Sequence, residues 1–317
     1  MGQTKVLYIV GSNRCGSTLL ARVLGDLPGY FAIGEGLVHF FCGSSEDHVP
    51  CGCGLSVQDC SFWKGTSLPL EEAPFAARWL RLRRTPFLGA YCRRYPQQIS
   101  GLIASLGNFY DTVARRSGAE VIVDSSKNPL HARLLSWVPN IDLYVVFLVR
   151  DPRSVVASSR QPKQWLPGAS PLHATMRWLG LMLGSEYLRT RVRNWRRLRY
   201  EDFVKEPRRA ILDITGDLGY GVVESPYLAG CVAELGPQHM LGSNPDKLKS
   251  GPTRIADRSV HLPWLGRFLV SVLTAPLLLR YGYWGNGSRF QTVASPEIAV
   301  MQEMAGQGAK VDSEIEA

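Results

Sequence analysis

Short apolar runs that alternate with helix-like segments constrain the fold of this chain more than any other feature of its sequence. Three such runs precede segments with helical spacing of apolar residues: 5–10 before 19–27, 120–124 before 130–137, and 142–149 before 153–159. A further strand-like segment at 195–200 precedes a helical segment at 203–218. Continuous apolar strands that alternate with helices are typical of a parallel sheet covered on both faces. We therefore predict an α/β fold with a doubly wound parallel sheet flanked by helices. Ligands of such sheets bind at the carboxyl ends of the strands.

Between the first strand–helix unit and the second lies an insertion, at about residues 36–118, that is rich in cysteine, proline and glycine. Its apolar spacing predicts helices near 70–84 and 99–116, and we expect the insertion to act as a cap over the site. Further along, residues 161–190 predict a loop followed by a helix, and residues 221–261 predict a long irregular stretch.

With 317 residues, of which 45% are hydrophobic and 20% charged, the chain can bury a substantial core. We predict one domain over residues 1–294 and a disordered tail over 295–317, where the sequence is small, polar and without periodicity. The net charge of +9 suits an anionic ligand, a nucleic acid or an acidic membrane surface equally well.

Targeting signals are weak. Residues 1–20 lack the basic start and apolar run of a signal peptide, so we place the protein in the cytoplasm. The apolar run at 268–279 is shorter than the roughly 20 residues that a bilayer span requires. We therefore expect no transmembrane segment, while this run leaves peripheral membrane contact open as an interfacial helix.

The loop after the first strand is rich in glycine and hydrogen-bond donors. It reads Gly11-Ser12-Asn13-Arg14-Cys15-Gly16-Ser17-Thr18, which fits G-x-x-x-x-G-x-T with Ser17 where a Walker A lysine would stand. The glycines permit the turn, and backbone N–H groups at the following helix N-terminus attract an anion. Two hydroxyls and the guanidinium of Arg14 add donors, so we predict a phosphate site. The missing lysine argues against ATP or GTP hydrolysis.

A second candidate anion site follows the strand at 142–149. Arg150 stands at the carboxyl end of that strand, and the next two residues, Asp151 and Pro152, suit the cap and first position of a helix. Two separated anion sites in one sheet indicate a nucleotide that is phosphorylated at two places.

In these residues the chain resembles the sulfotransferases that use 3′-phosphoadenosine 5′-phosphosulfate (PAPS), in particular their bacterial and carbohydrate-type branches. The family's 5′-phosphosulfate loop, R-S-G-[ST]-[ST], resembles residues 14–18, and its 3′-phosphate motif, R-D-P-R with a serine eight residues after the first arginine, resembles Arg150 to Ser158. Further matches are D-S-S-K at 124–127, Y-E-D at 200–202, and Asn244-Pro245 followed by Lys247. The resemblance spans about residues 5–260 and implies a P-loop-like nucleotide-binding core.

The resemblance implies an enzyme that transfers the sulfuryl group of PAPS, in line and without a metal, to a hydroxyl or amine of a small-molecule or carbohydrate acceptor. It implies no nucleic-acid partner. Carried over by position, the residues implied to hold PAPS are Ser12, Arg14, Cys15, Gly16, Ser17 and Thr18 at the 5′-phosphosulfate, Arg150 and Ser158 at the 3′-phosphate, Tyr200 against the adenine, and Lys247 or Lys249 as further charge for the 3′-phosphate.

For the transfer itself, Arg14 and Lys127 are the cations implied to neutralise the leaving phosphate oxygen. The small-molecule branch of the family has a histidine two residues after this lysine, but here Asn128 and Pro129 follow it. The carbohydrate-type branch instead has a glutamate after the second strand, which resembles Glu35. We therefore expect Glu35 to be the general base, with two histidines, His39 and His131, as alternatives.

Seven cysteines occur in the chain, four of them in one cluster: Cys42, Cys51, Cys53 and Cys60. Their spacing, C-x₈-C-x-C-x₆-C, lacks the paired C-x₂₋₄-C knuckles of zinc sites, so we expect no metal and interpret them as buried or redox-sensitive thiols. Two other functions remain open. One is a P-loop kinase or NTPase, and the other is a non-enzymatic protein that binds anions or nucleic acid through its arginine clusters.

Overall fold

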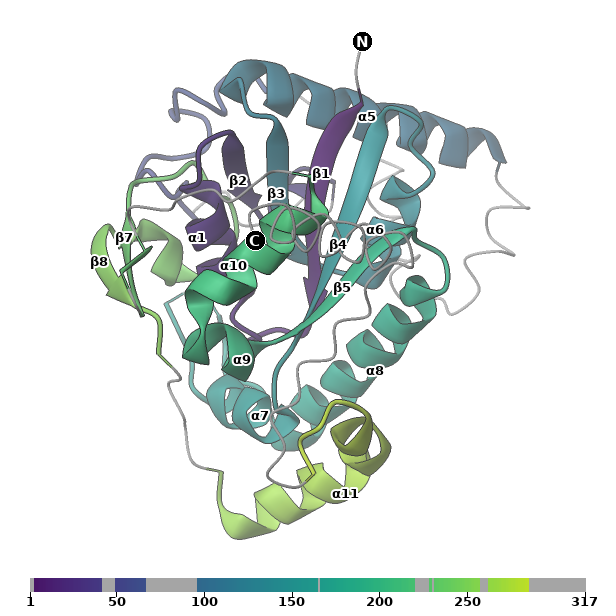
Figure 1. The fold of residues 1–317 in the computed structure, drawn as a ribbon, viewed down its shortest axis with the longest axis vertical. Coiled ribbons are helices and arrows are strands. Elements are labelled where there is room, and N and C mark those ends of the chain that lie inside the picture. The colour runs from purple at the N-terminus through teal and green to yellow at the C-terminus, as the bar shows by residue number, and fades with distance from the viewer. Residues whose placement is uncertain are drawn as a thin grey trace, which may run out of the picture.

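The structure, a computed structural model, describes residues 3–41, 49–66, 96–164, 166–219, 228–229, 231–256 and 262–284. Its centre is a five-stranded, wholly parallel sheet in the order β2-β3-β1-β4-β5, which confirms the predicted α/β fold (Figure 1). The strands are β1 (Thr4–Gly11), β2 (Tyr30–Gly34), β3 (Val121–Lys127), β4 (Ile141–Val149) and β5 (Asn194–Arg199). The crossover from β2 to β3 contains the insertion.

Strand β1 illustrates why these apolar runs form the centre of a sheet. Its side chains alternate between two separate cores: Val6, Tyr8 and Val10 pack into one, and Leu7 and Ile9 pack into the other. Because successive side chains of a strand point to opposite faces, a strand buried on both sides is apolar without interruption. The strands on either side of β1, β3 and β4, also bury side chains in both cores. A sheet with apolar side chains on both faces needs a layer of helices on each face.

The helices cover the two faces unequally. One face is covered by α1 (Ser17–Gly25), α9 (Tyr200–Lys205) and α10 (Pro207–Asp217). The other is covered mainly by α2 (Gly36–Phe41), α5 (Pro96–Ser117), α6 (Pro129–Leu135), α7 (Pro152–Arg160) and α8 (Pro171–Arg189), with the end of α11 (Trp264–Arg280). The first turns of α6, α7, α8 and α10 all contain proline, which suits a helix start because its missing N–H has no intrahelical partner there.

Two sequence-based expectations differ from the structure. The single helix expected over 203–218 is two helices, because Pro207 lacks the N–H that a continuous helix would use. The stretch 221–261, expected to be irregular, contains a small antiparallel sheet of β6 (Leu228–Ala229), β7 (Val232–Leu235) and β8 (Gly251–Arg254), with the 3-10 helix η1 (Pro245–Leu248) between the last two. These short strands carry little periodicity.

The helix expected at 99–116 is α5, whereas the one expected at 70–84 lies outside the described residues. Figure 1 shows α5 crossing the sheet near the amino-terminal ends of the strands. Its side chains Leu106 and Phe109 are buried in the core, and Asp111 accepts a hydrogen bond of 2.6 Å from Thr4 at the start of β1. This helix therefore covers the sheet, and the cap stays a prediction for the rest of the insertion.

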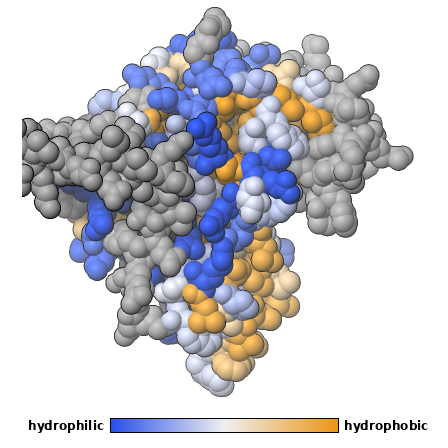
Figure 2. All heavy atoms as spheres, turned by 45° about the vertical axis from the view of Figure 1, so that its right-hand side comes forward, coloured by the Kyte–Doolittle hydropathy of each residue, from blue (hydrophilic) through white to orange (hydrophobic). Residues whose placement is uncertain are grey.

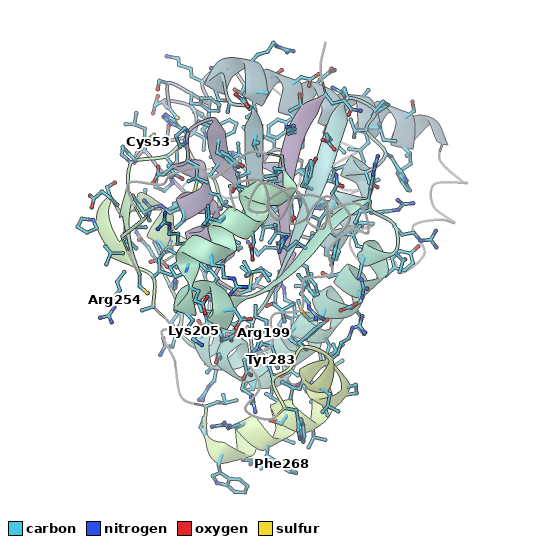
Figure 3. All side chains as sticks on the ribbon, viewed as in Figure 1. Cys53, Arg199, Lys205, Arg254, Phe268 and Tyr283 are labelled. Carbon is cyan, nitrogen blue, oxygen red and sulfur yellow. The ribbon has the colours of Figure 1, made fainter. Side chains whose placement is uncertain are left out.

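Helix α11 presents an exposed apolar face. Six of its large apolar side chains are more than half exposed: Trp264, Leu265, Phe268, Leu269, Val272 and Leu279. Figure 2 shows apolar side chains gathered on the lower part of the molecule, and Figure 3 places Phe268 at that end. Within the described residues, no helix is both long enough and apolar enough to cross a membrane. Any peripheral membrane contact of the kind left open by the sequence would be made through this face.

Candidate functional site

The glycine-rich loop joins β1 to α1 and leaves two buried donors unused. Gly16, the residue before α1, has φ of +95°, and Arg14 has φ of +63°. The hydroxyl Oγ of Ser12 and Nη1 of Arg14 are buried without a hydrogen-bond partner. Burial of unpaired donors is costly, so these two atoms are available to a ligand that accepts hydrogen bonds. The other terminal nitrogen of Arg14 donates to the Gln161 carbonyl at 3.0 Å and holds the side chain in place.

Arg150 lies beside this loop because β4 is the neighbour of β1. Its Nη1 donates to the Arg14 carbonyl at 3.0 Å, and its guanidinium carbon lies 4.3 Å from the centre of the Tyr200 ring. Tyr200 in turn packs against Gly16, where a Cβ atom would come closer than 3.0 Å to the ring. The structure thus brings together three residues predicted from separate motifs.

The turn after β4 forms as the sequence predicts. Asp151 accepts a hydrogen bond of 2.8 Å from the Arg153 N–H and caps α7, and Pro152 follows at the first helical position. Arg150, only 6% exposed, is fixed further by Trp178 of α8, whose indole N–H donates to its carbonyl at 3.2 Å. Ser158 lies on the last turn of α7 and is half-buried.

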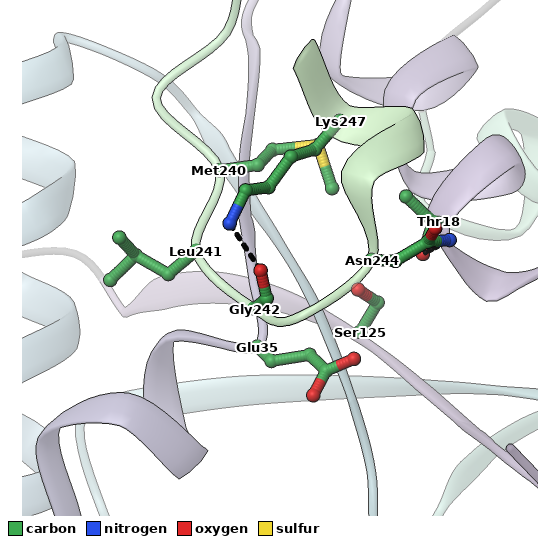
Figure 4. Close-up of a pocket in the computed structure, with 8 residues that line it drawn as sticks. All are labelled: Thr18, Glu35, Ser125, Met240, Leu241, Gly242, Asn244 and Lys247. Carbon is green, nitrogen blue, oxygen red and sulfur yellow. Dashed lines mark hydrogen bonds between the residues drawn. The ribbon is translucent and has the colours of Figure 1, made fainter. Parts of the chain in front are cut away.

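A pocket lies next to the loop, at the carboxyl ends of β2 and β3. Figure 4 shows its lining, which includes Thr18 of α1, Glu35 after β2, and Ser125 of β3. Glu35 forms a short ion pair with Lys127, the last residue of β3, whose φ is +67°. The expected base therefore lines the pocket and is paired with the expected cation.

A segment distant in sequence completes this pocket. Leu241 pairs with the end of β2: its N–H donates to the Ile33 carbonyl at 3.0 Å, and its carbonyl accepts from the Glu35 N–H at 2.8 Å. Asn244 caps η1 and donates to Thr18 Oγ1 at 3.0 Å. The neighbouring Gly242 has φ of +121°, and a Cβ there would crowd the Glu35 side chain. The Asn244-Pro245 match was the sequence signal of this segment, but its position beside Glu35 was not predicted.

The two lysines expected at the 3′-phosphate lie in different surroundings. Lys247 is 2% exposed, lines the pocket and donates to the Gly242 carbonyl. Lys249 is exposed and pairs with Asp246 at 2.6 Å. Burial raises the pKa of Asp246, but hydrogen bonds from Lys163 and Lys249 outweigh this and lower the pKa to about 2. Lys247 therefore lies with Thr18 and Glu35 at the pocket. Arg150, which was also expected at the 3′-phosphate, lies instead against Tyr200.

The two alternative bases lie away from the pocket lining. His131 is 1% exposed within α6, and His39 lies near the end of α2 with its ring edge-on to Phe40. Below the pocket, Asp124 of β3 is fully buried and accepts hydrogen bonds of 2.7 Å from the Tyr110 hydroxyl and the Ser126 N–H. Burial raises the pKa of Asp124 to about 6, although these hydrogen bonds oppose the shift.

Comparison with known proteins identifies the family of this chain. The family model described as "Sulfotransferase family" matches residues 7–223, more than half of the chain. The chain belongs to the sulfotransferase family. No curated protein sequence matches it.

Among solved structures, this sulfotransferase is similar to the sulfotransferase domain from the curacin biosynthetic pathway. That match has a TM-score of 0.50 and 15% identity, and it covers 87% of this chain and 98% of the other. The sulfotransferase domain from the Synechococcus PCC 7002 olefin synthase also matches, with a TM-score of 0.45, 20% identity, and coverage of 86% and 95%. At these identities the first match supports the shared fold alone.

Proposed function

We propose that this sulfotransferase moves the sulfuryl group of PAPS to a hydroxyl or amine of a small-molecule or carbohydrate acceptor. The observation that carries the proposal is the pair of anion-binding groups at the carboxyl ends of β1 and β4. The loop offers unused donors from Ser12 and Arg14, and Arg150 lies directly beside it. A nucleotide with phosphates at both its 3′ and 5′ positions matches two such groups.

The residues present fit this co-substrate. The loop N–H groups, Ser12, Arg14, Ser17 and Thr18 suit the 5′-phosphosulfate, because a helix N-terminus and fixed donors stabilise an anion. Arg150 and Ser158, which lies on the last turn of α7, are the residues proposed for the 3′-phosphate. Tyr200, which contacts both Gly16 and Arg150, is the aromatic residue proposed to lie against the adenine.

The proposed chemistry uses the pocket that borders the loop. The acceptor oxygen or nitrogen forms a bond to sulfur while the bond from sulfur to the phosphate oxygen breaks, and the bonding electron pair stays on that phosphate. The acceptor proton passes to the Glu35 carboxylate, and the charge on the leaving oxygen is neutralised by Lys127 and Arg14. We assign buried Lys247 to this side of the site, since it lines the pocket with Glu35. The transfer itself requires no metal in this proposal.

The proposal extends to the compartment and to the acceptor. All cysteines of the described residues are free, which suits the reducing cytoplasm. The acceptor would reach Glu35 from the pocket side, so its specificity would come from the segment around Gly242 and from the insertion.

Binding of 3′-phosphoadenosine 5′-phosphate separates this proposal from a kinase. A ligand at a hundredfold excess over its Kd stabilises the native state by about 2.7 kcal/mol, so this nucleotide should raise the melting temperature well above the effect of ATP with magnesium. Arg150→Ala should remove most of the difference. Arg160→Ala, which deletes an exposed arginine of α7, should keep it.

Activity is tested by incubating the protein with ³⁵S-labelled PAPS and a cell extract, and then identifying the labelled product. Equal stabilisation by the two nucleotides, or an Arg150→Ala variant that responds like the wild type, would contradict the assignment of the 3′-phosphate. Steeply salt-dependent binding of nucleic acid with no response to the nucleotide would favour the non-enzymatic alternative.

A further inference from the structure

Three cysteines of the insertion meet a histidine from far along the chain. Cys51, Cys53 and Cys60 offer sulfur atoms, His239 offers a ring nitrogen, and all four atoms lie within 4.8 Å of one another. We propose that these four side chains bind one zinc ion, which ties the insertion to the segment that lines the pocket. The site is separate from the sulfuryl-transfer chemistry, and the proposal does not depend on that function.

The distances match tetrahedral coordination. A zinc ion with Zn–S of about 2.3 Å and Zn–N of about 2.0–2.1 Å places two sulfurs about 3.8 Å apart and a sulfur and a nitrogen about 3.6 Å apart. In the structure, Sγ of Cys60 lies 3.7 Å from the sulfurs of Cys51 and Cys53. Nδ1 of His239 lies 3.2 Å from Cys60 Sγ and 3.9 Å from Cys51 Sγ. The two sulfur–sulfur distances lie just below the expected value, the two sulfur–nitrogen distances bracket theirs, and none of these three cysteines forms a disulfide.

The ligand types select the metal. Three soft thiolates with one imidazole in a tetrahedron favour zinc, and four protein ligands leave no position for water. Cys51 and Cys60 are 0% exposed, and the other two ligands are half-buried. A closed and largely buried site of this kind is structural, because it offers no open coordination position for a substrate.

The surroundings hold the ligands in place. The Gly52 N–H donates to the Met240 carbonyl at 2.9 Å, and the Trp63 indole donates to the His239 carbonyl at 2.7 Å. The ring of Phe62 stacks on His239 with centroids 5.4 Å apart. A Cβ at Gly52 would come closer than 3.0 Å to a carbonyl oxygen of the facing segment, so only glycine permits this approach. Figure 3 shows Cys53 on the side of the molecule next to β2.

A zinc ion bound by His239 would also hold in place a segment that lines the pocket. His239 directly precedes Met240 and Leu241, which line the pocket, and Leu241 pairs with the end of β2. The loop at 49–66 thereby anchors the segment that carries Gly242, Asn244 and Lys247 (Figure 4). Metal binding at such a site adds its free energy to folding and should stabilise this arrangement.

The spacing of the clustered cysteines does not indicate this site, and it led to the expectation of no metal. The fourth ligand is a histidine 179 residues after Cys60, so no second cysteine knuckle appears along the chain. Cys42, the first member of the sequence cluster, lies outside the described residues.

Elemental analysis of the full-length protein, purified under reducing conditions without chelator, tests the proposal directly. We expect one zinc per chain in the wild type and in Cys231→Ser, which changes an exposed thiol elsewhere. We expect loss of most of the zinc in Cys53→Ser and in His239→Ala. Cys53 is the least buried thiol of the set, so its serine variant is the one most able to fold.

A second measurement does not depend on any variant. X-ray absorption at the zinc edge of the wild type should fit three sulfur neighbours at about 2.3 Å and one nitrogen at about 2.0–2.1 Å. Protein without metal, or zinc bound by oxygen and nitrogen only, would overturn the proposal. So would full retention of zinc in both ligand variants. Failure of the labelling experiment with PAPS would leave the zinc result unchanged, so the two proposals can fail separately.

Discussion

Replacing Gly16 with alanine tests the contact between the loop and the Tyr200 ring. The alanine Cβ would come closer than 3.0 Å to two ring carbons. The ring cannot retreat easily, because Tyr200 is 5% exposed and the Arg150 guanidinium carbon lies 4.3 Å from the ring centre. The residue must also keep φ near +95°, a conformation in which an L-residue is strained.

The cost can be divided into two parts. Left-handed strain costs about 1–2 kcal/mol, and alanine recovers about 0.5–1 kcal/mol because it restricts the unfolded chain more than glycine does. Overpacking against the ring adds about 1–3 kcal/mol. Gly16→Ala should therefore lower the free energy of unfolding by about 1–4.5 kcal/mol. Gly118→Ala is the matched control: its φ is +65° and no atom lies within 4 Å of the new Cβ, so only the strain remains.

Urea titrations of both variants measure these differences, and a double-mutant cycle with Tyr200→Ala isolates the ring. We expect a coupling of about 1–3 kcal/mol between the two positions, since removing the ring relieves the overlap. The Gly16 variant should also lose the thermal response to 3′-phosphoadenosine 5′-phosphate, which the Gly118 variant should keep. Equal destabilisation by the two alanines, with no coupling to Tyr200, would refute the packing argument.

Three further predictions concern the base, a buried carboxyl and the apolar helix. Glu35→Gln should lower kcat by on the order of 10² to 10⁴ with little change in PAPS affinity, because an amide cannot accept the proton; a stable variant with near-normal initial rates would move the role to His39 or His131. Burial raises the pKa of Asp124 from 3.8 to about 6, so the folded state binds more protons in this range and stability falls by about 3 kcal/mol as the pH rises through it. Urea titrations across that window should show a weaker fall for Asp124→Asn, and an unchanged slope would assign the pH dependence to other groups. If α11 contacts membranes, Phe268→Ser should reduce sedimentation with anionic vesicles while Leu55→Ser, at another exposed apolar residue, should not; equal sedimentation would exclude this face.

Much of the sheet could be predicted because its signals are local. Strands β1, β3, β4 and β5 coincide with the segments predicted from the sequence, and the phosphate loop and the Arg150 turn are contiguous in sequence. Strand β2 was expected only through the family resemblance. Because the strands are parallel, the residues that follow them meet at the same edge of the sheet. Local signals therefore indicated most strands of the central sheet and the two loops proposed to hold the phosphates.

The rest of the site depends on contacts between distant segments. Leu241 adds to the end of β2 through two backbone hydrogen bonds, and backbone pairing leaves no residue pattern from which it could be found. The same contact brings Lys247 to Glu35 and His239 to the cysteines, which neither motif spacing nor periodicity indicates. The paired strands β7 and β8 are four residues each, too short for alternation to stand out.

Arg14 and Lys127 are the two residues other than glycine with positive φ in the described part of the chain. At each position the left-handed backbone conformation costs about 1–2 kcal/mol, a cost that glycine would avoid. Both are also the cations proposed to act on the leaving oxygen. A selection for thermal stability alone would therefore favour glycine at these positions and remove the site's charge first. Stability and activity therefore place opposite demands on positions 14 and 127. Laboratory evolution for stability should change these two residues, and evolution for activity should keep them.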